Sequence, residues 1–262
     1  MLPSFYTDDG SGLPLLLIHA FPLNASIWQP QRRDLSHQFR VISFSLPGFG
    51  RGGDYVPGTS IDDCADLAVE LLDELQIDRA VVAGCSMGGY ISLALQRRHP
   101  ERVLGLILSN TRAGADSREA AANRLVQANS IRTGGLAEFL AGMREKLLGP
   151  STRESAPDIL RLLDDMLASA TVEGTAGMLE AMARREDSTS LLESLTIPVC
   201  LIAGAEDTLI PPAEAERMHS QQPAAELHVL PNSGHLSCLE RPILFNDVVS
   251  SFLISNFSND HG

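Results

Sequence analysis

Short apolar runs, rich in leucine and β-branched residues, alternate along the chain with stretches in which apolar residues recur every three or four positions. The first pattern predicts buried strands and the second predicts amphipathic helices. Their alternation is typical of an α/β protein with a mostly parallel central sheet flanked by helices. A short edge strand is expected near Phe5, and further strands are expected at Pro14 to His19, Arg40 to Ser45, Ala80 to Gly84, Val103 to Ser109, Pro198 to Ala203 and Glu226 to Leu230.

Two of the helical stretches have a well-defined apolar face. The first begins after Ser60, a residue type favoured at the N-cap, and the second begins after Ser86 and stops before Pro100. Both helices can therefore cover the sheet. Their apolar faces consist of Ile61, Ala65, Ala68, Leu72 and Leu75 in the first, and of Met87, Tyr90, Ile91, Ala94 and Leu95 in the second.

The alternation stops at about Arg112 and resumes after Leu195, and every segment between them has the helical pattern. We therefore expect a core domain at residues 1–111 and 196–262, with a helical cap at residues 112–195 inserted after the sixth strand. Because Phe139 is the only aromatic residue of this cap, a pocket beneath it would be walled mainly by leucine, methionine and alanine. Candidate substrate-binding residues are Phe21, Phe139, Met143 and Met166.

The chain is acidic, with 33 Asp and Glu residues against 20 Lys and Arg residues and a formal net charge of -13. This charge repels phosphate backbones and anionic lipid surfaces, so neither nucleic acid nor a membrane is expected as a partner. The apolar run Leu13 to Leu23 is interrupted by Pro14 and His19 and follows no basic segment. It is typical of neither a membrane span nor a signal peptide, and a soluble, cytoplasmic monomer or homodimer is expected.

The four cysteines have no spacing typical of a metal site or of a disulfide framework. We interpret them as reduced structural thiols, and we expect no metal and no cofactor. Disorder is expected only near the chain ends, for example at Ser258 to Gly262. The cysteines are Cys64, Cys85, Cys200 and Cys238.

The segment Gly84-Cys85-Ser86-Met87-Gly88 lies between a predicted strand and a predicted helix. A G-x-S-x-G match alone is common by chance, but this context is typical of a nucleophile elbow, which exposes the serine hydroxyl. Glycine is expected at both flanks because a side chain there would collide with a neighbouring strand or helix. Ser86 is therefore the candidate nucleophile.

The loop after the first long strand, His19-Ala20-Phe21-Pro22, is expected beside this elbow. The backbone N–H groups of Phe21 and Met87 would then form an oxyanion hole. We interpret His19 as a structural residue of this loop rather than as a base. Phe21 would also wall the acyl pocket.

Two further loops follow strands and carry an acid and a histidine. Asp207 is the candidate orienting acid, with its neighbour Glu206 as the alternative, and His235 is the candidate base in the loop Asn232 to Leu236. The other histidines are interpreted as structural or solvated: His37, His99 and His219 lie near helix ends, His228 lies in a strand and His261 lies in the tail. The order Ser86, Asp207, His235 is the order of a serine hydrolase with a nucleophile elbow.

At this point the sequence resembles the α/β-hydrolase superfamily over essentially its whole length. The resemblance implies the α/β-hydrolase fold, although Ala20 and Ser45 stand where many relatives have glycine and aspartate. Segments around Trp28 and His235 are similar to 3-oxoadipate enol-lactonase-like proteins and small carboxylesterases. The motifs are His19-Ala20-Phe21-Pro22, Leu46-Pro47-Gly48-Phe49-Gly50-Arg51, Gly84-Cys85-Ser86-Met87-Gly88-Gly89, Gly204-Ala205-Glu206-Asp207, Gly234-His235-Leu236-Ser237 and Glu240-Arg241-Pro242.

These residues predict cleavage of a small-molecule carboxylic ester or lactone through an acyl-enzyme on Ser86. Three alternatives stay open: a carbon–carbon bond hydrolase, a perhydrolase with the same triad, and a receptor-like, ligand-binding member that turns over slowly. The acidic chain disfavours dianionic substrates, although one well-placed arginine, for instance Arg184 or Arg185, could reverse this preference locally.

Overall fold

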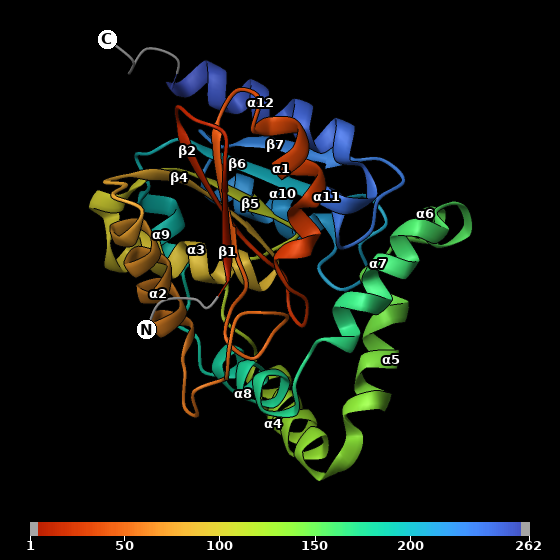
Figure 1. Ribbon diagram of the computed structural model, residues 1–262. Coiled ribbons are helices and arrows are strands. Elements are labelled where there is room, and N and C mark those ends of the chain that lie inside the picture. Colours follow the sequence, from red (N-terminus) through yellow and green to blue (C-terminus); the bar gives the residue numbers. More distant parts are fainter. Residues whose placement is uncertain (1–4, 258–262) are drawn as a thin grey trace.

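A seven-stranded sheet forms the centre of the protein in the computed structural model, which describes residues 5–257 (Figure 1). The strand order is β1-β3-β2-β4-β5-β6-β7, and in the described sheet β1 is antiparallel to β3 while the remaining pairs are parallel. The expected mostly parallel sheet is therefore confirmed, whereas the expected disorder at Ser258 to Gly262 and the tail residue His261 lie outside the described residues. The strands are β1 (Tyr6–Asp9), β2 (Pro14–Ile18), β3 (Arg40–Phe44), β4 (Ala80–Cys85), β5 (Val103–Ser109), β6 (Val199–Gly204) and β7 (Glu226–Leu230).

The central strands of the sheet are buried on both faces, and successive side chains of a strand point to opposite sides. In β2, Leu16 and Ile18 join one apolar cluster, and Leu15 and Leu17 join the other. All four side chains are at most 1% exposed. A continuous apolar run in the sequence thus supplies two cores, one on each face.

Helices cover both faces of the sheet, as expected (Figure 1). The face that carries Leu16 packs against α2 (Ile61–Glu74), α3 (Met87–Arg98), α9 (Thr189–Ser194) and α10 (Pro212–Gln221). The opposite face packs against the 3-10 turn η1 (Ala25–Trp28), α1 (Gln29–Leu35), α11 (Ser237–Glu240) and α12 (Pro242–Phe257). A second 3-10 turn, η2 (Pro100–Arg102), follows α3.

Ser60 caps α2, as its position before the apolar face predicts. Its hydroxyl accepts a hydrogen bond from the backbone N–H of Asp63, and the Asp63 carboxylate accepts one from the Ser60 N–H. This reciprocal pair satisfies two donors that a helix start otherwise leaves without partners. The N-terminus of α2 is therefore encoded locally.

Helices α4 to α9 join β5 to β6; in Figure 1, α4 and α8 lie below the sheet, and α5, α6 and α7 lie to its right. The expected α/β-hydrolase fold with a helical segment between two strands is confirmed, but its expected place after the sixth strand is wrong. It follows β5, the fifth described strand, and the five strands expected before Arg112 match β1 to β5, so the strands themselves were placed correctly and only the ordinal was wrong. We call this segment the helical insertion; its elements before α9 are α4 (Arg118–Ser130), the π turn η3 (Ile131–Gly135), α5 (Leu136–Leu147), α6 (Pro150–Ser155), α7 (Pro157–Ala168) and α8 (Val172–Ala183).

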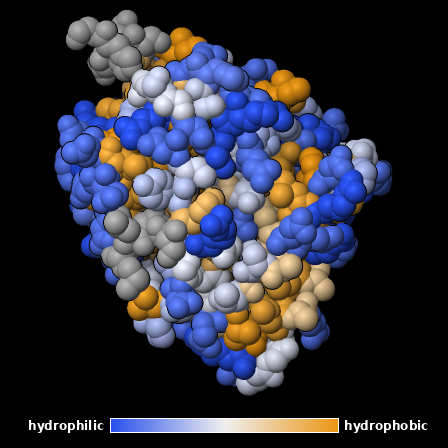
Figure 2. All heavy atoms as spheres, in the orientation of Figure 1, coloured by the Kyte–Doolittle hydropathy of each residue, from blue (hydrophilic) through white to orange (hydrophobic). Residues whose placement is uncertain are grey.

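The surface shown in Figure 2 is mostly polar, with apolar side chains gathered at its lower end, where α4 and α8 lie in Figure 1. The large exposed apolar residues of these two helices are Leu125, Val126 and Val172. Within residues 5–257, no helix is both long enough and apolar enough to cross a bilayer.

Candidate active site

Ser86 occupies the sharp turn between β4 and α3. Its backbone has φ of 56° and ψ of -112°, in the left-handed half of conformational space that residues other than glycine rarely adopt. The turn is held by the Ser86 N–H, which donates to the Ser109 carbonyl, and by the Thr111 hydroxyl, which donates to the Ser86 carbonyl. This is the strained geometry of a nucleophile elbow.

Glycine is required on both sides of the elbow. A Cβ on Gly84 would lie 2.2 Å from the Gly88 carbonyl oxygen, and a Cβ on Gly88 would lie 2.1 Å from the Ile18 carbonyl oxygen. Both distances are far shorter than a carbon–oxygen contact allows. The same close approach brings the start of α3, where Met87 is the first residue, against the end of β2 and hence near the loop that carries Phe21.

His235 and Asp207 form a buried hydrogen-bonded pair. The His235 Nδ1 lies 2.8 Å from the Asp207 Oδ2, and the two residues are 2% and 4% exposed. The other carboxylate oxygen accepts hydrogen bonds from the backbone N–H groups of Leu209, at 2.9 Å, and Ile210, at 3.0 Å. Asp207 therefore has a fixed orientation. Because the Nδ1 of His235 contacts this carboxylate, the Nε2 edge of the His235 ring faces away from it.

Asp207 stays ionised although it is buried. Burial alone would raise the pKa of its carboxyl group, but the charge and hydrogen bond of His235, together with the donors from Ile210 and Asn110, hold that pKa below its usual value. An ionised Asp207 can accept the Nδ1–H of His235 and stabilise the imidazolium.

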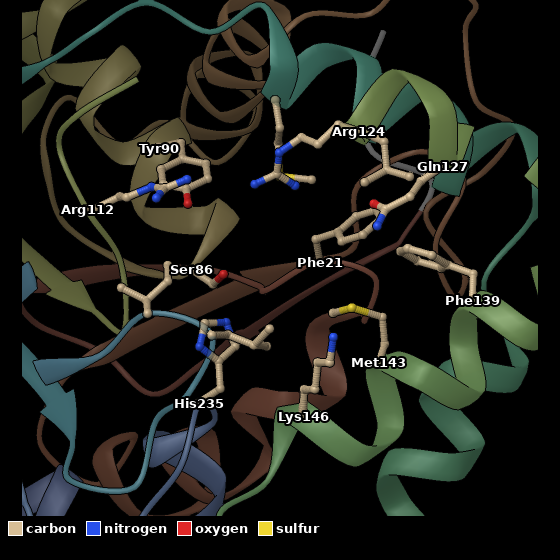
Figure 3. Close-up of a pocket in the computed structure, with 14 residues that line it drawn as sticks. Phe21, Ser86, Tyr90, Arg112, Arg124, Gln127, Phe139, Met143, Lys146 and His235 are labelled. Carbon is tan, nitrogen blue, oxygen red and sulfur yellow. The ribbon is translucent and has the colours of Figure 1, made fainter. Parts of the chain in front are cut away.

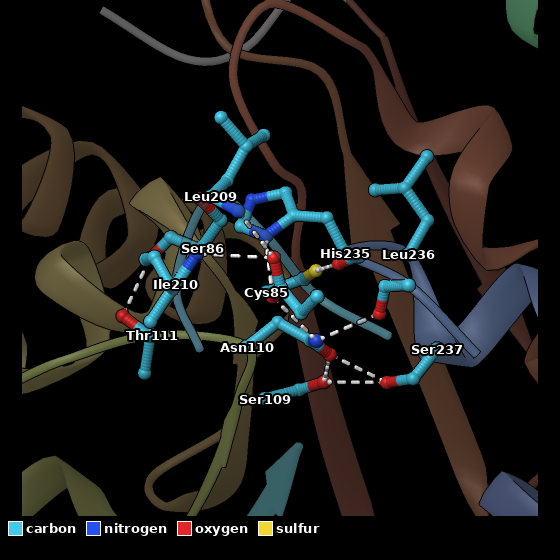
Figure 4. Close-up of polar contacts among 12 residues, drawn as sticks. Cys85, Ser86, Ser109, Asn110, Thr111, Leu209, Ile210, His235, Leu236 and Ser237 are labelled. Carbon is cyan, nitrogen blue, oxygen red and sulfur yellow. Dashed lines mark hydrogen bonds and ion pairs between the residues drawn. The ribbon is translucent and has the colours of Figure 1, made fainter. Parts of the chain in front are cut away.

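Asn110 is a residue of this site that the sequence reasoning missed. Its amide nitrogen donates to the Asp207 Oδ2 and to the Gly234 carbonyl, both at 3.0 Å, while its amide oxygen accepts from the hydroxyls of Ser109 and Ser237 (Figure 4). Asn110 follows β5, which lies between β4 and β6 in the sheet. The sequence did contain a signal for Asn110: it is a polar residue directly after β5, and β5 lies between the strand that precedes Ser86 and the strand that precedes Asp207.

A second missed residue, Glu240, is 2% exposed and binds the chain on both sides of His235. One carboxylate oxygen accepts from the N–H groups of Gly234 and Leu236, and the other accepts from the N–H of Gly149 in the helical insertion. Glu240 thus connects the histidine loop with the start of α6.

Glu206, the alternative acid, has a different position. Its carboxylate accepts hydrogen bonds from the backbone N–H and the hydroxyl of Ser151 in α6. Of the two neighbouring acids, Asp207 is the one that contacts His235.

His19 fixes the loop after β2. Its Nδ1 lies 2.9 Å from the Ala20 carbonyl, and its Nε2 accepts the backbone N–H of Leu46 at 3.0 Å. Complete burial lowers the pKa of His19 to about 4, against a smaller opposing effect of the Ala20 hydrogen bond. The ring is therefore neutral at neutral pH, in agreement with its interpretation as structural.

A cavity of about 210 Å³ opens in front of Ser86 (Figure 3). Among the sequence-predicted residues, it brings together Ser86, His235, Phe21, Phe139 and Met143. Figure 3 shows the Ser86 hydroxyl and the His235 ring facing the same hollow. The complete lining is Phe21, Ser86, Tyr90, Arg112, Arg124, Gln127, Phe139, Met143, Lys146, Leu179, Met182, Leu209, Ile210 and His235.

Met166 does not belong to this lining. It is 2% exposed and packs in the apolar cluster with Leu163 and Leu167. The reason is that the apolar stripe of α7 faces the core, so a methionine on that stripe is used for packing.

The expected apolar lining is only partly correct, because three cations, Arg112, Arg124 and Lys146, also line the cavity. Arg184 and Arg185, named from the sequence as possible local cations, are absent from this lining. Arg185 instead pairs with Asp116 and stacks on the Tyr90 ring.

The described residues hold one group with the composition of a metal site, Cys200, Glu226 and His228, on β6 and β7. Burial raises the pKa of the Cys200 thiol, which keeps the sulfur protonated at neutral pH and disfavours it as a ligand. All four cysteines are unpaired and buried.

Comparisons with known proteins agree with this geometry. Residues 14–242 match the model of the alpha/beta hydrolase fold family. The chain is 31% identical to 3-oxoadipate enol-lactonase 2 of Acinetobacter baylyi, over 91% of this chain and 88% of that protein. A thermophilic esterase from Thermogutta terrifontis, solved with malate bound, has 36% identity and a TM-score of 0.92, over 96% of this chain and 93% of that one. The enol-lactonase from Burkholderia xenovorans LB400 has 27% identity and a TM-score of 0.87, over 95% of both chains.

Proposed function

Because the chain belongs to the alpha/beta hydrolase fold family, we propose that it hydrolyses a small carboxylic ester or lactone through an acyl-enzyme on Ser86. The observation that carries the proposal is the arrangement of His235, which lines the cavity of Ser86 while its Nδ1 is held by the buried Asp207. The esterase and enol-lactonase relatives support this reaction class.

The proposed first half-reaction forms the acyl-enzyme. The Nε2 of His235 takes the proton of the Ser86 hydroxyl as its oxygen attacks the carbonyl carbon. The backbone N–H groups of Phe21 and Met87 stabilise the negative oxygen of the tetrahedral intermediate. The carbon–oxygen bond to the alcohol then breaks, and His235 gives its proton to the departing oxygen.

The second half-reaction is the reverse with water in place of the alcohol. His235 removes a proton from water, and the resulting hydroxide attacks the acyl carbon. The bond to the Ser86 oxygen breaks, the serine regains its proton from His235, and the carboxylic acid leaves. For a lactone, the alcohol and acid parts remain one molecule.

Replacement of the nucleophile tests the proposal. Nitrophenyl esters of increasing chain length and a set of lactones are assayed with the wild type, with Ser86→Ala, and with Ser194→Ala, which changes an exposed serine on α9. We expect loss of at least about a thousandfold in kcat for Ser86→Ala, unchanged circular dichroism, and normal activity for Ser194→Ala.

Two outcomes would contradict the proposal. The first is full activity in Ser86→Ala. The second is labelling of Ser86 by a chromogenic ester without sustained release of product, which would instead favour the receptor-like, slow-turnover alternative.

A further inference from the structure

The cavity in front of Ser86 is cationic in a chain whose formal net charge is -13. Its lining contains Arg112, Arg124 and Lys146, whereas none of its fourteen residues is an aspartate or a glutamate. A local excess of positive charge on an acidic protein is a specific feature of this cavity, because the average field of the molecule has the opposite sign.

One buried carboxylate organises the arginine side of the cavity. Asp116, whose side chain is 1% exposed, binds Arg112 at 2.5 Å, Arg124 at 2.5 Å and Arg185 at 2.9 Å. One negative charge thus faces three guanidinium groups, two of which line the cavity.

Asp116 is ionised at neutral pH and can therefore bind the three guanidinium groups. Burial alone would raise its pKa, but the hydrogen bond and charge of Arg124 and the charge of Arg185 hold the pKa below its usual value. Asp116 and its three arginine partners together have a formal charge of +2 at neutral pH; Glu214 and Asp187 act electrostatically on Arg112 and Arg185, respectively.

Asp116 also orients the guanidinium group of Arg124. Its Nε donates to Asp116, and one terminal nitrogen lies 3.7 Å from the sulfur of Met182. These contacts use Nε and Nη1, and no hydrogen bond to another described residue uses Nη2, so its N–H groups remain for a ligand. A planar guanidinium held in this way is suited to bind a carboxylate through two parallel hydrogen bonds.

Lys146 adds a cation from a different helix. Within residues 5–257 it forms no ion pair. Figure 3 shows Arg124, from α4, and Lys146, from α5, both extending toward the hollow that Ser86 faces. An anionic group in the cavity would therefore meet charge from two sides.

We propose that the Ser86 cavity selects substrates that carry a free carboxylate besides the scissile ester or lactone bond, and that Arg124 and Lys146 bind this carboxylate. This inference rests on the proposed function and names its substrate class. The cavity volume of about 210 Å³ restricts the substrate to a small molecule, such as the monoester of a short dicarboxylic acid.

The test compares substrates that differ only in charge. Monomethyl esters of malonic to adipic acid are paired with the same esters in which a carboxamide replaces the free carboxylate, and hydrolysis is followed by titration of released acid. We expect the wild type to have a kcat/KM about tenfold or more higher for the best carboxylate ester than for its carboxamide, because a charge-assisted pair contributes more than a neutral one.

Variants locate the selectivity. Arg124→Met should lower the kcat/KM for the carboxylate ester about tenfold or more while the carboxamide ester changes less than about threefold. Arg118→Met, on an exposed residue of the same helix outside the lining, is the matched control and should change neither value. If Arg124→Met does not fold, Lys146→Met changes an exposed side chain and should reduce the same preference.

A binding measurement separates this inference from the hydrolytic reaction. Calorimetry with glutarate should give saturable binding to Ser86→Ala, weaker binding to Ser86→Ala/Arg124→Met, and loss of affinity as sodium chloride is raised. Equal hydrolysis of the two ester series, an equal fall for both in Arg124→Met, or glutarate binding that Arg124→Met does not weaken would overturn the inference. Inactivity toward all esters with preserved glutarate binding would reject only the proposed hydrolysis.

Discussion

At the residue scale, two side chains of the candidate site depend on unusual backbone conformations at strand ends. Ser86 has φ of 56° after β4, and Asn110 has φ of 48° after the neighbouring β5. Each conformation turns the chain sharply as it leaves the sheet, so that the side chain lies at the edge where the acid and histidine loops also end. The positions of the polar groups are thus determined by the backbone as much as by residue type.

Removal of Asn110 should impair turnover more than substrate binding. Asn110→Ala deletes the donor to the Asp207 carboxylate and the donor to the Gly234 carbonyl, so both the acid and the histidine loop lose a fixed contact. We expect kcat to fall about tenfold to a hundredfold with little change in KM. The dependence of kcat on pH should also shift, because the Asp207 carboxyl group loses one of the hydrogen-bond donors that lower its pKa.

The matched control for this prediction is Asn256→Ala, at a more exposed asparagine whose side chain donates to the Phe252 carbonyl within α12. It should retain wild-type kinetics. A kcat and a pH profile in Asn110→Ala equal to those of the wild type would contradict a positioning role.

His19 makes the stability of the fold depend on pH. Its folded pKa of about 4 is lower than the value of about 6.5 in an unfolded chain, so between these pH values the unfolded state binds an additional proton. The free energy of unfolding should therefore fall as the pH is lowered through this window, by up to about 1.4 kcal/mol per pH unit. This contribution is fully present above pH 6.5.

The measurement is urea unfolding at pH 7 and pH 5 for the wild type and for His19→Gln, which keeps an acceptor for the Leu46 N–H but cannot be protonated. The wild type should lose up to about 2 kcal/mol more than the variant between the two pH values. His37→Gln, at an exposed histidine, should behave like the wild type. Identical pH dependence in wild type and His19→Gln would exclude this effect.

At the scale of elements, strands and core helices are predictable because apolar residues recur along the sequence with the period of each element. Each of the six residues of β4 is buried, and its predicted end differs from the observed end by one residue. Contacts between distant segments have no such repetition. Both Met143 and Met166 lie in helices of the insertion, yet one lines the cavity and the other packs in the core, and this difference depends on how α5 and α7 dock.

The triad candidates could be located from sequence because each follows a strand at the same edge of the sheet. Asn110 also follows a strand at this edge, but its partners Asp207 and Gly234 lie 97 and 124 residues away, so its role could not be assigned from its position alone. Glu240 and Arg124 do not follow strands, and each belongs to a cluster that joins distant parts of the chain. Asp116, for instance, binds Arg124 and Arg185, which are 61 residues apart. Such clusters are visible only once the helices are placed.

Glu240 connects two elements, and its replacement should affect both. In Glu240→Gln one carboxylate oxygen becomes an NH2 group, which cannot accept an N–H from Gly234, Leu236 or Gly149. We expect the free energy of unfolding to fall by about 1–3 kcal/mol and kcat to fall as well, because the histidine loop loses a fixed contact. Denaturant unfolding and ester kinetics measure the two effects. Glu216→Gln, on the exposed side of α10, should alter neither quantity, and a Glu240→Gln protein as stable and active as the wild type would refute this role.

At the scale of the whole molecule, the helical insertion supplies cations and apolar side chains to the lining of the candidate site. Arg124, Phe139, Met143 and Lys146 come from α4 and α5, whereas Ser86 and His235 come from the sheet core. The division into a catalytic core at residues 1–111 and 196–262 and a cap at residues 112–195 remains a prediction. It assigns the reaction to the sheet edge and the choice of substrate to the insertion.

Phe139 is a residue at which this division can be tested, because its side chain lines two neighbouring hollows. It lines the cavity in front of Ser86, where its ring lies 6.0 Å from that of Phe21, and it also lines a neighbouring hollow of about 270 Å³ between α4 and α5. Phe139→Ala should join the two spaces and shift the preferred nitrophenyl ester toward longer acyl chains. Phe139→Leu keeps an apolar wall of similar length and should keep the wild-type preference. An unchanged chain-length profile in a folded Phe139→Ala protein would mean that the acyl group binds away from α5, and that the insertion does not set the size of the substrate.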